Sequence, residues 1–224
     1  MIPRVRSPAR RPPHSDMVGL RLRGMGARKQ VEAPPAAFAE ALTQLRGARF
    51  RPEVFVEEMP APQRIAPHAA AVSADVTVDG DDVATGRLVV LYDPAGNDAW
   101  QSTFRCVAYV RAAVEPEMVT DALLGGVGWT WLMEALVDHG AAYLAPSGTV
   151  TRVVSESFGG MADDEATAEI EIRASWSPAE DLTGAVDIAP HAEAWGDVLC
   201  TAAGLPPVPP GVVAMPTRRG QRGR

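Results

Sequence analysis

The run Ala168-Glu-Ile-Glu-Ile-Arg-Ala-Ser-Trp176 decides the fold class of this 224-residue chain. Apolar side chains occupy every second position, and Glu169, Glu171, Arg173 and Ser175 fill the positions between them. Side chains on a β-strand point alternately to the two faces of a sheet, so this alternation predicts a strand with one buried and one solvated face. A half-solvated strand is typical of an antiparallel sheet.

Further strand patterns precede this run and are separated by turn sequences. The strand candidates, in chain order, are residues 53–57 as a short edge strand, 70–78, 83–92, 102–114, 149–156 and 168–176. Asp79-Gly80 is typical of a tight hairpin turn, because Asp-Gly tolerates positive φ. Residues 93–98 indicate a longer turn, and Pro146-Ser147-Gly148 predicts another. Short turns between successive strands imply antiparallel pairing.

Helical patterns lie before, between and after these strands. The expected helices are residues 34–47, a glycine-interrupted region from 115 whose stronger part is 129–139, and a last helix from about 187 to 204. The order is α-βββ-α-ββ-α. The sequence therefore predicts an α+β fold with a mainly antiparallel sheet of five to six strands and helices packed on one face.

Charge divides the chain into three parts. Residues 1–29 carry eight basic side chains against Asp16 alone, and residues 217–224 carry four arginines. The remaining nine basic and 27 acidic residues give the middle a net charge of −18. We predict a disordered basic segment over 1–33, a single α+β domain over 34–208 and a disordered Pro/Arg-rich tail over 209–224. A body this acidic repels nucleic acid, so any nucleic-acid binding would depend on the tails.

The cellular location is predicted from cysteine usage and hydropathy. Cys106 and Cys200 both lie in apolar stretches, which indicates two buried free thiols in a reducing compartment. The chain has no apolar run of the roughly 18 residues that a membrane span needs. It also has no uninterrupted apolar core of a signal peptide near its N-terminus. We therefore predict a cytoplasmic protein without membrane contact.

Motifs for catalysis, cofactors and metals do not emerge from the sequence. The four histidines show no i, i+4 pair, and HExxH, CxxC and GxSxG spacings are missing. Glu169 and Glu171 could form a carboxylate pair on one strand face, but a salt-bridged face with Arg173 is the stronger interpretation. The sequence predicts no catalytic residue, no cofactor and no metal.

The polar face of the predicted sheet is the expected interaction surface. Arg105, Arg111 and Arg173 should line up there with acidic residues of neighbouring strands. Trp100, in a turn, could anchor a partner. The complete candidate surface comprises Trp100, Arg105, Arg111, Arg152, Glu169, Glu171 and Arg173.

Several segments of the chain resemble one known family. They are Arg51-Pro-Glu53, Leu88-Val-Val-Leu-Tyr-Asp-Pro-Ala-Gly-Asn-Asp-Ala-Trp-Gln101, Val114-Glu-Pro-Glu-Met118, Pro146-Ser-Gly-Thr-Val-Thr-Arg152, Ser157-Phe-Gly-Gly160, Ala168-Glu-Ile-Glu-Ile-Arg-Ala-Ser-Trp-Ser-Pro178 and Ala203-Gly-Leu-Pro-Pro207. This pattern is similar to the actinobacterial family known as domain of unknown function 3000. The resemblance covers roughly residues 34–208 and implies an actinobacterial cytosolic protein, but no activity. The element order also resembles small secretion-chaperone-like domains, which bind protein segments and often dimerise.

Three function hypotheses follow from these observations. The first is a non-enzymatic protein-binding or adaptor domain, which binds an unknown protein or self-associates through the sheet. The second is a nucleic-acid-associated protein that acts through its Arg-rich tails. The third is an enzyme of unrecognised type that uses polar residues such as Arg105, Arg152, Glu169 and Arg173.

Overall fold

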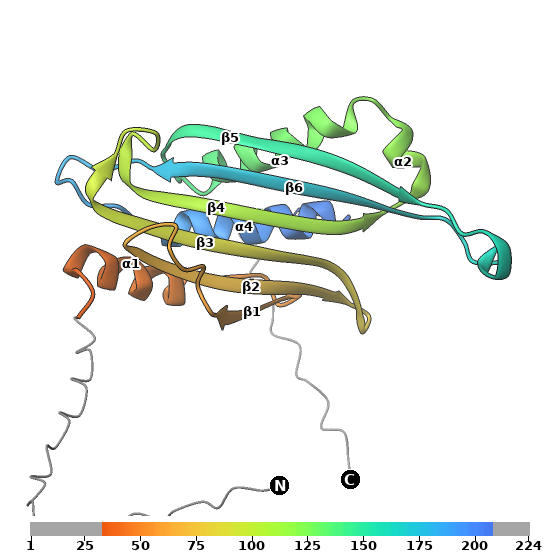
Figure 1. Ribbon diagram of the computed structural model, residues 1–224, viewed down its shortest axis with the longest axis horizontal. Coiled ribbons are helices and arrows are strands. Elements are labelled where there is room, and N and C mark those ends of the chain that lie inside the picture. Colours follow the sequence, from red (N-terminus) through yellow and green to blue (C-terminus); the bar gives the residue numbers. More distant parts are fainter. Residues whose placement is uncertain (1–32, 208–224) are drawn as a thin grey trace, which may run out of the picture. The chain divides into compact units, whose positions relative to one another are not determined.

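The computed structural model of the chain describes residues 33–207, in which six strands form one antiparallel sheet (Figure 1). The strands are β1 (Val54–Met59), β2 (His68–Val78), β3 (Asp81–Asn97), β4 (Ser102–Val114), β5 (Tyr143–Ser155) and β6 (Thr167–Pro178). Their order across the sheet is β1-β2-β3-β4-β6-β5, which leaves β1 and β5 at the two edges. The tails predicted to be disordered lie outside the described residues, apart from position 33.

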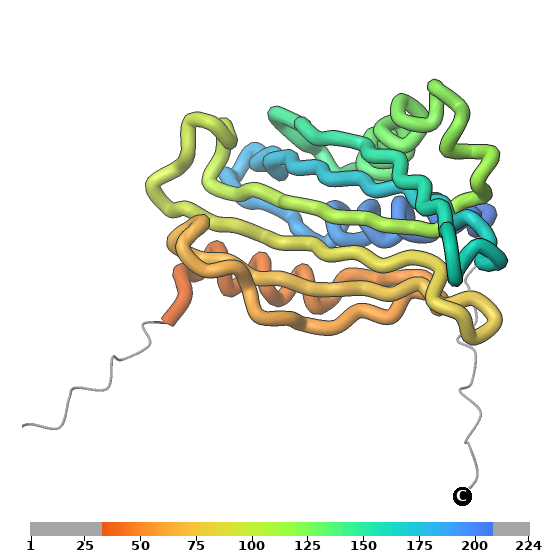
Figure 2. Tube along the Cα trace, turned by 45° about the vertical axis from the view of Figure 1, so that its right-hand side comes forward, coloured from red at the N-terminus to blue at the C-terminus, as the bar shows by residue number. Residues whose placement is uncertain are grey.

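The helices cover one face of this sheet, as Figures 1 and 2 show. They are α1 (Ala36–Gly47), α2 (Pro116–Thr120), α3 (Leu124–Asp138) and α4 (Ala189–Ala202), and a short 3-10 helix, η1 (Gly159–Met161), lies between β5 and β6. An α+β fold with helices on one face of an antiparallel sheet is therefore confirmed. The strand that we expected over 53–57 is β1, so four strands rather than three precede α2.

The core lies between the sheet and the helices, where the alternating apolar residues meet. Ile170, Ile172 and Trp176 of β6 are buried, and so are Trp195 and Leu199 of α4. These residues belong to one continuous hydrophobic cluster. Every strand except β5 contributes buried side chains to it. The alternation that predicted the strands is thus the pattern that forms the core.

Two local predictions were wrong. The helix expected from residue 129 begins at Leu124, because the glycine-rich stretch continues into α3. A Cβ atom at Gly128 would lie 3.0 Å from Cδ1 of Ile170, so a glycine allows the helix to approach the sheet closely. The turn expected at residues 146–148 is a bulge within β5, where the register shifts between Leu144 and Ser147. β5 is an edge strand, and an edge tolerates a proline that donates no hydrogen bond.

Candidate functional site

The face of the sheet opposite the helices carries a polar row and an apolar row next to each other. Residues that pair directly across strands point to the same side of a sheet. The pairings place Glu57, Ser73, Arg87, Tyr109, Arg173 and Thr149 in one row across all six strands. They place Met59, Ala71, Val89, Val107, Ser175 and Ser147 in the next row. We call this side of the sheet the open face.

A groove of about 730 Å³ crosses the open face between these two rows. Its lining residues are Pro62, Arg87, Val89, Val107, Ala108, Tyr109, Ser147, Gly148, Thr149, Arg173, Ala174 and Ser175. Val107, in the centre of the sheet, remains 37% exposed. The groove is therefore built from β3, β4, β6, β5 and one residue of the β1–β2 connector.

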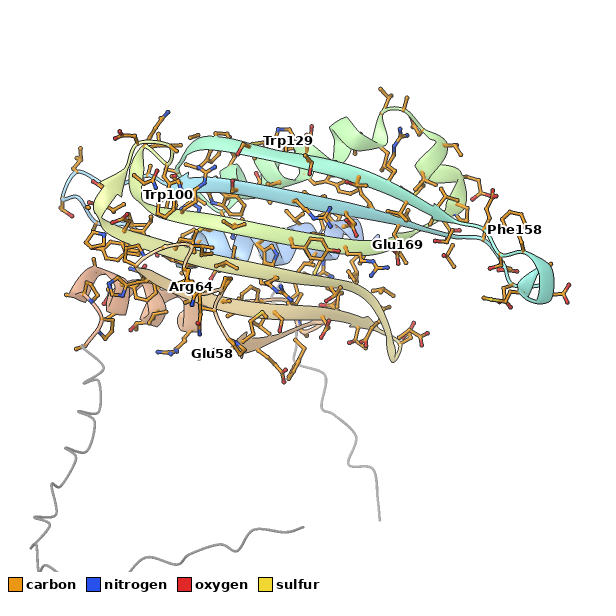
Figure 3. All side chains as sticks on the ribbon, viewed as in Figure 1. Glu58, Arg64, Trp100, Trp129, Phe158 and Glu169 are labelled. Atoms are coloured by element: carbon orange, nitrogen blue, oxygen red, sulfur yellow. The ribbon has the colours of Figure 1, made fainter. Side chains whose placement is uncertain are left out.

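The β1–β2 connector, residues 60–67, covers the open face beside the groove (Figure 1). Its Ala61 and Ala66 pack against a small buried cluster that includes Val89 and Leu91. Trp100, labelled in Figure 3, packs against the same cluster from the β3–β4 turn and is half-buried. This cluster forms one end of the open face, and the groove begins where its cover ends.

Arg105 lies on the open face beside the groove, two residues along β4 from Val107, and is only 7% exposed. Its guanidinium donates to the carbonyl oxygens of Ala145 (2.9 Å) and Ser175 (3.2 Å). It also donates to three hydroxyl oxygens, those of Ser147 (3.2 Å), Ser175 (2.7 Å) and Ser177 (3.1 Å). The expectation that Arg105 forms cross-strand ion pairs on a solvated face is wrong, because β5 and β6 enclose it and none of the described salt bridges includes it.

Arg105 places a positive charge beside the groove. Burial lowers the pKa of its guanidinium, but an arginine remains protonated in proteins. Two of its three hydroxyl acceptors, Ser147 and Ser175, line the groove, so the cation lies one hydrogen bond away from the groove surface. A buried cation without a carboxylate partner favours a nearby anion.

The lining of the groove contains arginines and no acidic residue. Arg87 is exposed and has no ion-pair partner among the described residues. Arg173 borders the groove as well. Residues 33–207 contain nine arginines against 26 acidic residues, a net charge of −17. Three of those nine arginines gather in or beside the groove, which makes it the anion-favouring part of an acidic domain.

Beside the groove, ion pairs cross the strands of the open face. Arg173 pairs with Glu171 (2.7 Å), and its guanidinium lies 5.2 Å from the ring centroid of Tyr109. The Tyr109 hydroxyl donates to Glu171 (3.1 Å), and burial followed by this hydrogen bond raises the pKa of Tyr109. Arg111 makes two hydrogen bonds to Glu169 (2.8 and 2.6 Å). The salt-bridged face that we expected here is confirmed, and such exposed pairs contribute only about 0–1 kcal/mol each.

A family described as Protein of unknown function (DUF3000) matches residues 34–213. The chain belongs to this family. The match spans all the helices and strands of the DUF3000 fold described above and confirms the resemblance drawn from the sequence. No curated protein and no solved structure matches the chain.

The structure separates the seven predicted surface residues of this DUF3000 chain into groups. Arg173 lines the groove, and Arg105 bonds to its lining serines. The ion-paired residues Arg111, Glu169 and Glu171 lie beside the groove. Trp100 packs at one end of the open face. Arg152 points to the helix side, where its Nη1 donates to the carbonyl oxygens of Val119 (2.9 Å) and Asp121 (2.6 Å) at the end of α2. Arg152 is therefore not brought together with the other six.

Sequence reasoning missed Arg87, Val89, Val107, Ser147 and Ser175. Arg87 and Val89 of β3 pair with Tyr109 and Val107 of β4, which lie on the same face as Arg105. This alternation along the two strands was the signal from which Arg87 and Val89 could have been predicted. It is weak because residues 88–91 are apolar at every position. Ser147 was hidden by the bulge in β5, whose register no local pattern shows, whereas the alternation in β6 placed Ser175 on the polar face without singling it out.

Two further properties concern the described residues alone. Between residues 33 and 207, no group of three or more His, Cys, Asp or Glu side chains is arranged to hold a metal ion. None of the helices in this range has the length and hydropathy of a membrane span.

Cys106 and Cys200 are buried free thiols, as predicted, and burial raises the pKa of each to about 12.

Proposed function

We propose that this DUF3000 domain is a protein-binding domain whose open-face groove holds a segment of a partner polypeptide. One observation carries the proposal. The groove exposes Val107 next to the row that carries Arg87 and Arg173, and no acidic residue lines it. An exposed apolar floor beside Arg87, which has no ion-pair partner among the described residues, is suited to a ligand that combines apolar and acidic groups.

The size of the groove supports this function. A volume of about 730 Å³ lies within the roughly 300–1,000 Å³ that pockets for bound groups occupy. The groove is open along the sheet, so a segment of chain can enter it from the side. Several side chains of a partner would fill it, with the apolar ones over Val107.

The polar rim offers specific contacts to such a segment. Ser147 and Thr149 belong to the edge strand β5 and present hydroxyl groups that can bond to a partner backbone. Arg87 has all its donors available for a carboxylate, and an arginine binds a carboxylate through two parallel hydrogen bonds. These groups would orient the partner, while the apolar floor contributes most of the affinity.

The residues of the enzyme hypothesis do not form one site. Arg105 and Arg173 belong to the groove, but Arg152 bonds to α2 on the other side of the sheet, and Glu169 is held by Arg111 outside the groove. General acid–base chemistry needs its groups within hydrogen-bond reach of a common substrate. This dispersion favours binding over catalysis.

A capture experiment with matched variants tests the proposal. The tagged full chain and its Val107→Asp, Arg87→Glu and Thr85→Asp variants are used as baits in host extract, and bound proteins are quantified. Thr85 is exposed on the same face, opposite Arg111 and outside the groove, so it is the control for an added carboxylate. We expect a partner that the wild type and Thr85→Asp retain and that both groove variants lose at least tenfold.

Thermal melting of each bait separates binding from folding. Arg87 is a surface residue, so Arg87→Glu should melt within a few degrees of the wild type. If both groove variants fold and retain the same proteins as the wild type, the groove is not the binding site and the proposal fails.

A further inference from the structure

We infer that the groove is occupied by the tip of the β5–β6 hairpin from a second copy of this chain. The inference rests on the proposed function and names the partner segment that the groove takes. The hairpin tip comprises residues 156–166. The inference is carried by the chemical complementarity between this tip and the groove.

The hairpin tip projects beyond the rest of the sheet. β4 ends at Val114, which pairs with Ala168 of β6, whereas β5 and β6 continue to the pair Ser155–Thr167. The tip then extends past this last pair, as Figures 1 and 2 show. A projecting hairpin is the part of a molecule that can enter a groove on another copy.

The tip exposes large apolar side chains. Phe158 is 76% exposed and Met161 is 60% exposed, and Figure 3 places Phe158 at the projecting end of the hairpin. An aromatic ring and a thioether side chain of this exposure are typical of contact residues, because burying them against a partner removes apolar surface from water. The groove offers the matching apolar surface mainly at Val107, which is 37% exposed, with the buried Val89 beside it.

The tip is also acidic. Glu156, Asp163, Asp164 and Glu165 lie in it, and residues 156–166 contain no basic side chain. Arg87 borders the groove without an ion-pair partner among the described residues, Arg173 borders it while paired with Glu171, and Arg105 lies beside it without a carboxylate partner. Two domains of net charge −17 repel each other in general, so a contact between copies has to form where arginines gather. The groove is that place on the open face.

The tip of a chain has to enter the groove of another chain. It points away from its own sheet, and folding it back would break the backbone pairing of β5 with β6. Two copies that face each other across a two-fold axis would each insert one tip into the other, which doubles the buried area. The assembly would be a symmetric dimer.

Sedimentation velocity over a concentration series tests the inference on the full chain. We expect a concentration-dependent dimer for the wild type and a monomer for Phe158→Ser and for Val107→Asp over the same range. Leu182→Ser is the matched control, because Leu182 is a fully exposed apolar residue away from both surfaces, and this variant should dimerise like the wild type.

Cross-linking between two different chains identifies the contact. A tagged Phe158→Cys chain is mixed with an untagged Val107→Cys chain under mild oxidation, and the two native thiols do not compete because both are buried. We expect a disulfide between the tagged and untagged chains, and at least fivefold less when the tagged chain is Leu182→Cys.

The possible outcomes separate the two proposals. A wild type that is monomeric at all concentrations overturns the dimer, and so does a dimer that persists in Phe158→Ser without the mixed disulfide. If Val107→Asp still loses a captured partner in either case, the groove keeps its proposed binding function and only the identity of its occupant is wrong.

Discussion

The indole Nε1 of Trp176 donates a hydrogen bond of 3.0 Å to Nδ1 of His191, and both side chains are buried. Trp176 belongs to β6 and His191 to the first turn of α4, so the bond joins the sheet to the helix that covers it. An indole only donates, so Nδ1 has to be the unprotonated nitrogen. Burial lowers the pKa of His191 to about 4, which keeps this acceptor free at neutral pH.

This bond predicts a loss of stability in mild acid. His191 has an ordinary pKa of 6.5 when unfolded and about 4 when folded, so between these values the unfolded chain binds a proton that the native chain does not. The free energy of unfolding should therefore fall as the pH falls from 6.5 to 4, by up to about 3 kcal/mol from this residue. Urea denaturation at pH 7.5 and pH 4.5 measures it.

The control for this prediction is His191→Gln, whose oxygen can accept from Trp176 but does not titrate. The variant should lose less stability than the wild type between the two pH values. Equal losses would show that His191 does not titrate as its burial implies.

His139 should act with the opposite sign. Its Nε2 lies 2.8 Å from Oδ2 of Asp197, and its Nδ1 lies 3.5 Å from Oε2 of Glu193. The hydrogen bond to Asp197 is the main cause that raises the pKa of His139. Its stabilising contribution is complete below pH 6.5 and is lost as the pH rises through the folded pKa. His139→Gln should therefore unfold more easily at pH 6, by less than about 1 kcal/mol for this half-buried pair, and like the wild type at pH 9.

Thermal melts at pH 6 and pH 9 compare His139→Gln with the wild type. A destabilisation of the same size at both pH values would mean that the ring contributes through packing alone.

Arg105 should be sensitive even to a conservative change. Lysine cannot reproduce the planar guanidinium that donates to Ala145 on β5 and to Ser175 and Ser177 on β6. Arg105→Lys leaves buried acceptors without a donor and should lower the free energy of unfolding by about 1–3 kcal/mol. Urea denaturation at pH 7.5 measures this loss.

Arg111→Lys is the matched control, since Arg111 and Glu169 form a partly exposed pair on the same face. This change should cost less than about 1 kcal/mol. Equal costs at the two arginines would contradict the structural role of the buried one.

Gly86 should not tolerate a methyl group. A Cβ atom there would lie 2.7 Å from Cδ2 of Leu199 and 2.9 Å from the carbonyl oxygen of Tyr109, so the Leu199 side chain and the backbone of β4 would both have to shift. Gly86→Ala should therefore lower the free energy of unfolding by about 1–3 kcal/mol. In Gly126→Ala, the new methyl group meets open space within α3, and alanine should stabilise the helix by about 0.5–1 kcal/mol. Thermal melting should show a lower melting temperature for Gly86→Ala and a higher one for Gly126→Ala. A Gly86→Ala variant as stable as the wild type would show that the sheet has room for a methyl group at this position.

The sequence predicted the open face better than the groove on it. Alternation placed Arg111, Glu169, Glu171 and Arg173 on one side of the sheet, where they lie. It also placed Arg105 on that side, but its burial depends on the bulge in β5, which brings Ala145 and Ser147 over it. A bulge depends on pairing between distant strands, and alternation along one strand carries no information on such pairing.

By itself, the order of apolar and polar residues determined the α+β class, the strands and the side of each strand that is buried. It could do so because side-chain direction repeats every two residues along a strand, which is a local property. Only the tertiary structure decided that Arg87, Val107 and Ser147 line one groove and that Arg152 is excluded from it. Ser147 comes from β5, which β6 separates from the β3–β4 hairpin of Arg87 and Val107, and their proximity depends on register and strand order, which are properties of the assembled sheet.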